Sequence, residues 1–143
     1  MPTILATGGT GYVGSHTCVE LLVKGYKVIL LDSLINSSRN IFDKIIQIIS
    51  NYNSDYSKNL TFISGDIRDY KLLDDIFRNE KDNKNKIDAV LHYSGLKSVD
   101  ESFLRPLDYW DVNFCGTINL LKVMEKYCCT NLVFSSSATI YSS

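Results

Sequence analysis

The sequence lacks several features that would point to particular classes of protein. No apolar run comes near the roughly 18 residues that a membrane-spanning helix needs. The charges nearly cancel, with 15 Lys and Arg against 16 Asp and Glu and a net charge of −1, which argues against a nucleic-acid partner. The four cysteines show no C-x-x-C or zinc-like spacing, so we expect reduced thiols and no metal site. With no signal-peptide pattern after Met1, these absences favour a cytoplasmic protein without a membrane partner.

Glycine is scarce as well, but half of it lies in one stretch. The chain has 8 glycines, and four of them fall within TGGTGYVGSHT, residues 7–17. Because glycine loses the most conformational freedom on folding, such a cluster costs stability unless it serves a purpose. The stretch matches both G-x-G-x-x-G and G-x-x-G-x-x-G, with its glycines at Gly8, Gly9, Gly11 and Gly14.

Strand and helix patterns alternate along the chain. Short apolar runs predict strands at residues 3–6, 27–32, 60–64, 87–93 and 131–135. Helical periods predict helices at residues 12–24, at about 41–50, after Asp69, and from Pro106 to about Lys126. This alternation predicts one α/β domain over residues 1–143, a doubly wound parallel sheet of the Rossmann type. Ligands of such sheets bind beyond the carboxyl ends of the strands, where the unusual stretches of this sequence lie.

Some finer expectations concern packing. The apolar face of the first helix is predicted to carry Val13, Thr17, Cys18, Leu21 and Leu22. The polar stretches 51–59 and 79–86 are expected to be surface loops without a core pattern. Trp110 is expected to pack in the core.

The context of the glycine stretch favours a dinucleotide site. It follows a predicted strand and opens a predicted helix, and Asp32 closes the next strand eighteen positions after Gly14. The amides of Tyr12 and Val13 would then face a pyrophosphate, where the helix dipole contributes about 0.3–1 kcal/mol. Asp32 would accept hydrogen bonds from the adenosine ribose and repel a 2′-phosphate, which favours NAD over NADP. A tight turn without a ligand is the alternative, and Arg39 is the nearby cation that could favour NADP.

The pair Asp66 and Ile67 follows the third predicted strand. The carboxylate could accept a hydrogen bond from the amine of an adenine, and the isoleucine could pack on the ring. On local grounds alone, Asp66 could equally cap the helix that follows.

Three later stretches narrow the interpretation when they are taken with TGGTGYVGSHT. They are HYSGLKSVDES (92–102), PLDYWDVNFCGTINLL (106–121) and NLVFSSSATIYSS (131–143). In this order the four stretches resemble the UDP-glucose 4-epimerase family, an extended branch of the short-chain dehydrogenase/reductase superfamily. The resemblance spans the chain and implies NAD-dependent interconversion of UDP-glucose and UDP-galactose through a 4-keto intermediate. NAD would be the cofactor and would be regenerated in each turnover.

The resemblance also assigns cofactor contacts position by position. It implies that NAD is contacted by Gly8, Gly11, Tyr12, Val13, Gly14, Asp32, Ser33, Leu34, Ile35, Asn36, Ser37, Asp66, Ile67, Tyr93, Ser94, Gly95, Leu96, Lys97 and Val112. Asn113 would brace the site from the neighbouring helix position. Lys97 would reach phosphate or ribose oxygens, although a lone loop lysine is more often a solvated side chain.

Catalysis and sugar binding are implied for the end of the chain. Ser137 occupies the position of the family's catalytic hydroxyl, and Thr139 would contact the sugar beside it. The superfamily's base is the tyrosine of a Y-x-x-x-K pair downstream of the fifth strand, and no such pair follows Ser137. Ser94 and Ser142 also depart from the family's pattern. We therefore expect an incomplete domain that lacks the substrate region, binds NAD weakly and does not turn over alone.

Neighbouring functions stay open beside this one. A nucleotide-sugar decarboxylase or uronate epimerase would differ in contacts beyond Ser143. A 4,6-dehydratase is disfavoured because its family places an acidic pair just after the fifth strand, where this chain has Ser137-Ala138-Thr139. A non-catalytic NAD-sensing protein is a further alternative. The expected partners are a UDP-sugar and, for the complete protein, a second copy in a homodimer, as is frequent in the family.

Overall fold

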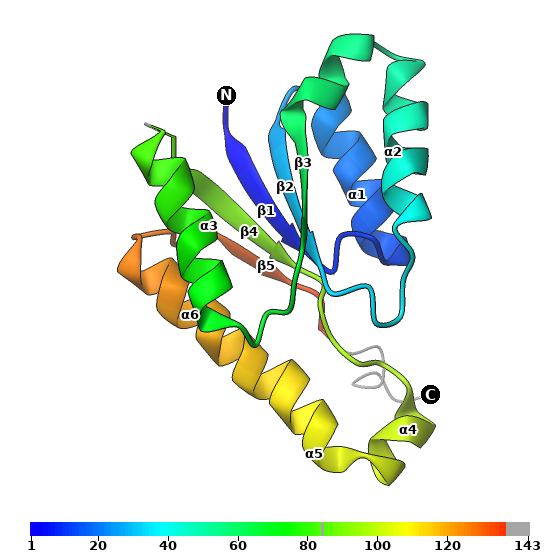
Figure 1. Ribbon diagram of the computed structural model, residues 1–143, viewed down its shortest axis with the longest axis vertical. Helices are drawn as coiled ribbons and strands as arrows, with labels where there is room; N and C mark the ends of the chain where they lie inside the picture. The colour runs from blue at the N-terminus through cyan, green and yellow to red at the C-terminus, as the bar shows by residue number, and fades with distance from the viewer. Residues whose placement is uncertain (84, 137–143) are drawn as a thin grey trace.

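The computed structural model describes residues 1–83 and 85–136 of the chain. In this part, five parallel strands form one sheet in the order β3-β2-β1-β4-β5 (Figure 1). They are β1 (Thr3–Thr7), β2 (Lys27–Asp32), β3 (Leu60–Ser64), β4 (Ile87–His92) and β5 (Leu132–Phe134). The chain moves outward from β1 to β3 and resumes on the other side of β1 with β4. In sheets of this topology, the crevice at that reversal is the expected ligand site.

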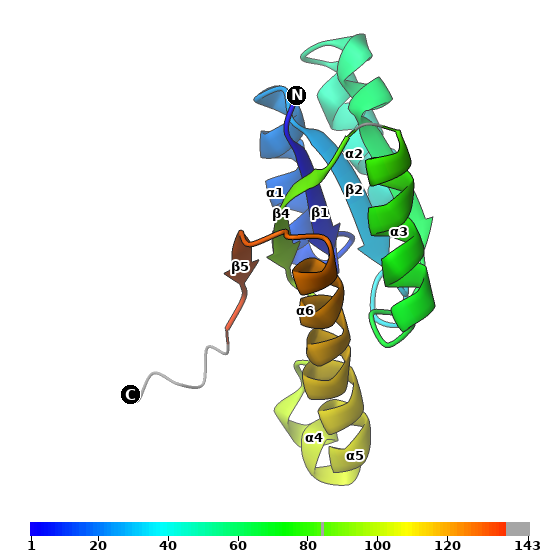
Figure 2. The same cartoon turned by 90° about the vertical axis from the view of Figure 1, so that its left-hand side faces the viewer.

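Helices cover both faces of the sheet (Figures 1 and 2). The helices α1 (Tyr12–Val23) and α2 (Asn40–Ser50) pack on one face, and α3 (Tyr70–Asp82) and α6 (Gly116–Lys126) pack on the other. The remaining helical segments are α4 (Val99–Leu104), α5 (Pro106–Tyr109), the 3-10 helix η1 (Ser54–Asn59) and the π-helix η2 (Trp110–Cys115). The predicted doubly wound fold of the Rossmann type is confirmed. No helix in the described ranges combines the length and the apolar character that crossing a membrane requires.

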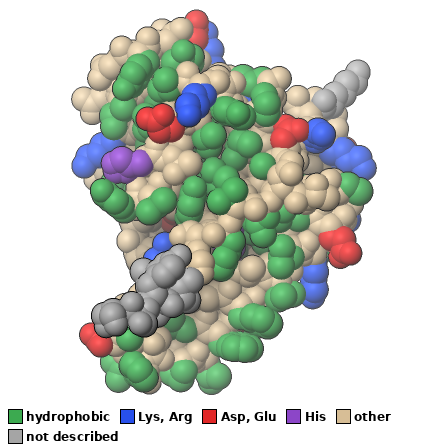
Figure 3. Space-filling view, turned by 180° about the vertical axis from the view of Figure 1, so that it is seen from behind, with side chains coloured by type: hydrophobic (Ala, Val, Ile, Leu, Met, Phe, Trp, Pro, Cys, Tyr) green, Lys and Arg blue, Asp and Glu red, His purple; other side chains and the backbone are tan. Residues whose placement is uncertain are grey.

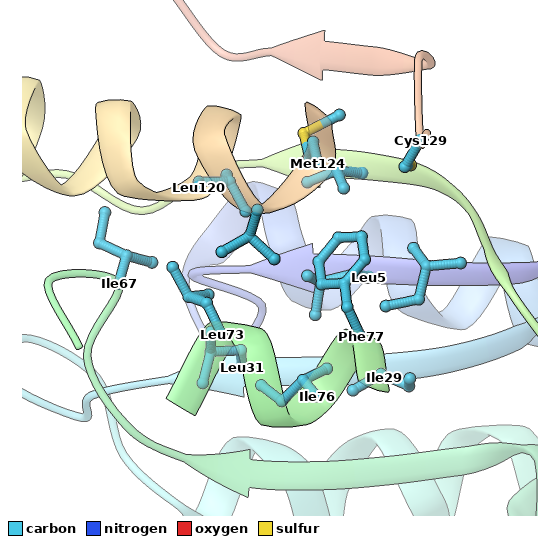
Figure 4. Packing of buried hydrophobic residues seen from close by; sticks show 13 residues of the cluster. Leu5, Ile29, Leu31, Ile67, Leu73, Ile76, Phe77, Leu120, Met124 and Cys129 are labelled. Atoms are coloured by element: carbon cyan, nitrogen blue, oxygen red, sulfur yellow. The ribbon is translucent and has the colours of Figure 1, made fainter. Parts of the chain in front are cut away.

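The central strands are apolar on both sides because both sides are covered. All of β1 is buried, and so is β2 from Val28 onward. Alternate side chains of these strands belong to two separate core clusters, one under α3 and α6 and one under α1 and α2. Figure 4 shows the first cluster, in which side chains of α3 and α6 meet those of the sheet, among them Leu5, Leu31, Leu73, Phe77, Leu120 and Met124. Continuous apolar runs such as KVILLD are typical of this two-sided burial.

The helix α3 begins as its sequence predicts. The Asp69 carboxylate accepts a hydrogen bond from the amide of Leu72 at 3.0 Å, which satisfies one of the amides that a helix leaves unpaired at its start. Leu73, Ile76 and Phe77 then bury the apolar face of the helix.

Removing this cap should cost measurable stability. Asp69→Ala is expected to lower the free energy of unfolding by about 1 kcal/mol, because the Leu72 amide loses its acceptor. Urea unfolding of the 143-residue chain measures the change. Asp69→Asn keeps an oxygen acceptor and is the matched control, expected to lose less than half as much. Equal losses in the two variants would contradict a capping role.

Four local predictions are wrong in whole or in part. The stretch 79–86 is not a loop throughout, since α3 continues to Asp82, and the stretch 51–59 contains η1, from which Tyr56 packs against the α1–α2 core. On α1 the fully buried positions are Gly14, Cys18 and Leu22, whereas Val13 is 49% exposed. Cys18 and Leu22 are buried as predicted, and Leu21 packs against the same core, so the prediction is wrong at Val13. Hydrophobicity alone misplaced the start of the face because its first member is a glycine, which permits close approach without adding apolar surface.

The predicted long helix from Pro106 to Lys126 exists, but it contains the π-helical segment η2. Trp110 at the start of η2 is 61% exposed and stacks on Phe114 with ring centroids 4.6 Å apart, so its assignment to the core is wrong. The reason is position, because α5 and η2 lie beyond the end of the sheet and away from the core (Figure 1). Apolar side chains gather at this lower end of the molecule (Figure 3), and the exposed ones include Phe103, Leu104, Leu107, Trp110 and Phe114.

Candidate functional site

The loops that follow β1, β2, β3 and β4 surround a cavity of about 390 Å³ together with Val112 of η2. Its lining residues are Gly8, Gly11, Tyr12, Val13, Gly14, Asp32, Ser33, Ile35, Asn36, Gly65, Asp66, Ile67, Tyr93, Ser94, Gly95, Leu96, Lys97 and Val112. The cavity thus lies at the carboxyl edge of the sheet, where the fold predicts a ligand.

Two glycines of the fingerprint are required by close packing. Gly8 has φ +66, and a Cβ atom there would lie 2.6 Å from the backbone nitrogen of Ser94 in the loop after β4. A Cβ atom on Gly14 would lie 2.5 Å from the carbonyl oxygen of Gly8. These contacts bring the loops after β1 and β4 together with the start of α1, and they explain the two glycines without any ligand.

Gly11 has no comparable explanation from packing. Its backbone is extended, with φ −70 and ψ 172, and a Cβ atom there would approach only the Gly8 carbonyl oxygen, at 3.2 Å. Gly11 precedes α1, which has no side-chain cap. Within the described ranges, no acceptor is found for the amides of Tyr12 and Val13, which belong to residues lining the cavity. The bare backbone and unpaired amides at a helix N-terminus are suited to an anion.

Asp32 at the end of β2 is held rigidly at the wall of the cavity. It is only 6% exposed, and its Oδ2 accepts a hydrogen bond from the Thr10 amide at 3.0 Å. Its Oδ1 accepts from the Leu34 amide at 2.9 Å and from the Ser37 hydroxyl at 3.0 Å. Ser37 in turn contacts the Thr10 hydroxyl at 2.7 Å. The carboxylate therefore links the loops after β1 and β2 and retains acceptor capacity on Oδ2.

Asp66 lines the cavity from the loop after β3. The Arg68 guanidinium, which donates to both of its carboxylate oxygens, holds the pKa of Asp66 below its ordinary value. Asp66 also accepts from the Arg68 amide at 2.8 Å, while the cap of α3 is Asp69. The alternative in which Asp66 caps that helix is therefore not observed.

The loop after β4 is held by Asn113. The Asn113 side chain accepts a hydrogen bond from the Leu96 amide at 2.8 Å and donates one to the Leu96 carbonyl at 3.0 Å. Gly95 packs on the same side chain, since a Cβ atom there would lie 3.1 Å from Asn113 Oδ1. The predicted bracing role of Asn113 fits this geometry, and its effect is to fix the segment that carries Lys97.

A buried histidine connects the ends of β1 and β4 to the segment that contains Asn113. His92, at the end of β4, lies 2.6 Å by its Nδ1 from the Thr7 hydroxyl and 2.9 Å by its Nε2 from the Thr117 hydroxyl. Because Thr117 donates its own proton to the Asn113 carbonyl at 2.6 Å, it must accept from His92, which places the ring proton on Nε2. Burial, and secondarily the charge of Lys97, lowers the pKa of His92 to about 4. The histidine is therefore neutral at physiological pH.

Tyr93 and Lys97 have the Y-x-x-x-K spacing in sequence, but they do not form the pair expected of the superfamily's base. Residues four apart face one another on a helix, whereas these two flank a loop. The Tyr93 hydroxyl donates instead to Thr17 of α1, at 3.4 Å. The cavity can therefore bind and orient a ligand, but these two side chains are not arranged as a proton-transfer pair.

Nearly all of the sequence-predicted cofactor residues line this one cavity; the two that do not are Leu34 and Ser37, which bind Asp32 instead. Ser137 and Thr139 lie outside the described residues. Gly65, which is not among the predicted cofactor contacts, also lines the cavity, and it follows β3 much as Gly8 follows β1. Arg39 is exposed, with its guanidinium 5.3 Å from the centre of the Phe62 ring, and it does not line the cavity. Within the described ranges, no three His, Cys, Asp or Glu side chains are grouped to hold a metal.

Comparison with known proteins gives the family. Residues 5–143 match the family model described as GDP-mannose 4,6 dehydratase. The chain belongs to this family. It is 46% identical over 138 residues to the UDP-glucose 4-epimerase of Bacillus subtilis (strain 168), covering 96% of this chain and 37% of that protein. It is 44% identical over 138 residues to the UDP-glucose 4-epimerase of Klebsiella pneumoniae, covering 96% of this chain and 91% of that protein. The predicted resemblance to the UDP-glucose 4-epimerases is confirmed.

Solved structures of family members agree with the fold. A Stenotrophomonas maltophila UDP-glucose-4-epimerase with bound NAD and formylated UDP-arabinopyranose superposes with a TM-score of 0.85 and 41% identity, covering 99% of this chain and 38% of that one. The Bifidobacterium longum UDP-glucose 4-epimerase, in complex with NAD+ and UDP, gives a TM-score of 0.83 and 41% identity, covering 97% of this chain and 38% of that one. The chain thus spans little more than a third of the length of most relatives that it matches.

Proposed function

We propose that residues 1–143 are the cofactor-binding part of an NAD-dependent UDP-glucose 4-epimerase, which interconverts UDP-glucose and UDP-galactose. The names of the relatives and the NAD bound in the neighbouring structures support this proposal. The observation that carries it is the start of α1, where Gly11 carries no side chain and the amides of Tyr12 and Val13 have no acceptor among the described residues that line the cavity or surround it.

The residues present fit a dinucleotide. The amides of Tyr12 and Val13 would hold its pyrophosphate, Asp32 would hold the adenosine ribose, and Asp66 with Ile67 would hold the adenine. When bound, NAD supplies a hydride acceptor and donor for the C4 position of a sugar. Ser137 and Thr139 are proposed to hydrogen-bond that sugar. The homodimer stays a prediction for the complete protein, and the exposed apolar side chains of α4, α5 and η2 are the surface on which to test it.

Cofactor preference tests the role of Asp32. We expect the 143-residue chain to bind NAD at least about tenfold more tightly than NADP, because a 2′-phosphate near the buried Asp32 carboxylate meets repulsion of roughly 1–4 kcal/mol per charge. Asp32→Ser should lose most of this preference. Asp43→Ser, on the exposed side of α2, is the matched control and should keep it. Calorimetric titration with each dinucleotide gives the ratio, and an unchanged ratio in Asp32→Ser would remove Asp32 from the site.

Turnover tests the reaction itself. The longer protein that contains these residues should convert UDP-galactose to UDP-glucose, whereas residues 1–143 alone should not, because the single Y-x-x-x-K match in their sequence, Tyr93 to Lys97, lies in a loop and does not form the catalytic pair. The description of the family model makes a 4,6-dehydratase the second candidate. A dehydratase would eliminate water and release a 4-keto-6-deoxy sugar, so product analysis separates the two. Release of that product without epimerisation would overturn the proposal.

A further inference from the structure

Arg68 connects two walls of the cavity without lining it. Its Nε donates to Asp66 Oδ1 at 3.1 Å, and one terminal nitrogen donates to Asp66 Oδ2 at 2.8 Å. The other terminal nitrogen donates to Asp111 Oδ2 of η2 at 2.9 Å. Arg68 itself faces a neighbouring cavity of about 450 Å³. Arg68 therefore acts on two walls of the cofactor cavity. On one wall it holds Asp66, and on the other it holds Asp111, the neighbour of the lining residue Val112.

The three hydrogen bonds from Arg68 to Asp66 determine which lone pairs of the carboxylate remain free to accept from a ligand. Asp66 Oδ1 accepts from both the amide and the Nε of Arg68, and Oδ2 accepts from one guanidinium nitrogen. A carboxylate offers about four lone-pair positions, so one position on Oδ2 remains for a ligand. A bidentate arginine also sets the plane of the carboxylate, which a lysine ammonium cannot do. Asp66 thus presents a single oriented acceptor and no donor.

The loop that carries Asp66 is docked on the helix below it. Asn119 of α6 donates to the Arg68 carbonyl at 2.9 Å. Ile67 packs against Gly116, where a Cβ atom would lie 2.7 Å from the isoleucine Cδ1. These contacts hold the backbone of the loop independently of the guanidinium. Arg68 is therefore left to orient the carboxylate.

We propose that Arg68 is a positioning residue which orients the Asp66 carboxylate toward the 6-amino group of adenine and so makes the cavity select 6-amino over 6-oxo purine dinucleotides. Adenine carries a donor at that position, whereas hypoxanthine and guanine carry an oxygen acceptor. An oriented carboxylate accepts a hydrogen bond from the 6-amino group and repels a 6-oxo oxygen. This inference rests on the proposed NAD site.

The test compares NAD with nicotinamide hypoxanthine dinucleotide, which differs from NAD at that position of the base. We expect the 143-residue chain to bind NAD at least about tenfold more tightly than the hypoxanthine analogue. Arg68→Met should weaken the binding of NAD about tenfold and the binding of the analogue much less, so that the ratio of the two Kd values approaches one. Arg68→Lys should fall between, because it keeps the charge without the fork. Arg78→Met is the matched control, since Arg78 lies on α3 and pairs with Asp74 and Asp75.

The ratio separates orientation from a general structural role. If Arg68→Met weakens both dinucleotides equally, or leaves the ratio as in the wild type, the inference is overturned even though NAD binds. If the wild-type chain binds neither dinucleotide, the proposed NAD site fails as well. Circular dichroism checks folding of each variant, and Asp111→Asn offers a second route if Arg68→Met does not fold. That change releases Arg68 from η2 but leaves the Asp66 pair, so it should keep a ratio above that of Arg68→Lys.

Discussion

Gly11→Val is expected to weaken NAD binding at least about a hundredfold, equivalent to about 2.7 kcal/mol, while the free energy of unfolding stays within about 1 kcal/mol of wild type. The backbone at Gly11 is extended, and a Cβ atom there would approach only the Gly8 carbonyl oxygen, at 3.2 Å. Because Gly11 lines the cavity, we expect the valine methyl groups to occupy it beside the amides of Tyr12 and Val13, for which the described residues offer no acceptor. Calorimetric titration and urea unfolding measure the two quantities separately.

Gly9→Ala is the matched control, and it is expected to have the opposite pattern of effects on stability and NAD binding. A Cβ atom at Gly9 would lie 2.5 Å from Cγ of the fully buried Leu30, and Gly9 does not line the cavity. This variant should lose stability, by about 1–3 kcal/mol for an overpacked core, and largely retain NAD affinity while it is folded. If Gly11→Val bound NAD as the wild type does, the start of α1 would not be the pyrophosphate site.

Acid is expected to destabilise the fold through His92 by about 3 kcal/mol between pH 6.5 and pH 4. Burial lowers the pKa of His92 from 6.5 to about 4 in the folded chain. Below pH 6.5 the unfolded chain therefore binds more protons than the folded one, and the free energy of unfolding falls as the pH falls through this window. Protonation would also require a second donor on a ring whose Nδ1 now accepts from Thr7.

His92→Gln isolates this contribution. A glutamine amide can accept from one threonine and donate to the other, but it does not titrate, so the variant should show a flatter profile between pH 6.5 and pH 4 and a lower stability at pH 7. His16→Gln changes the other histidine, which is exposed on α1, and should leave the wild-type profile intact. Urea unfolding at several pH values measures each profile. A wild-type slope retained in His92→Gln would assign the acid sensitivity to other groups.

The fold was predictable because its signals are local. The run KVILLD is apolar from Val28 to Leu31, which is typical of a strand covered on both faces, and Asp69 precedes a helix whose apolar residues recur with the helical period. Most residues that line the cavity were also predictable from local signals, because they lie in loops that directly follow the strands. Val13 was misplaced on α1 because the close contact of Gly14 with Gly8 decides how that helix packs.

The interactions that organise the site were not predictable in the same way. Arg68 meets Asp111 across 43 positions of sequence, and His92 meets Thr117 across 25. Neither pair has a composition or a spacing that distinguishes it from solvated polar residues. Such contacts exist only once the fold has brought the loop after β3 and the end of β4 beside η2 and α6.

The π-helical segment has a consequence for how this protein can diverge. Each residue of an α-helix advances the side-chain direction by about 100°, so a widened turn at Trp110–Cys115 shifts the angular phase between α5 and α6. The side chains at the two ends of the continuous helix from Pro106 to Lys126 therefore face different surroundings. Substitutions in α6 are constrained by the core, in which Leu120, Val123 and Met124 are packed, whereas α5 has no buried residue. Substitutions in α5 can therefore accumulate without a compensating change in α6, while η2 between them stays constrained by its contacts with the site.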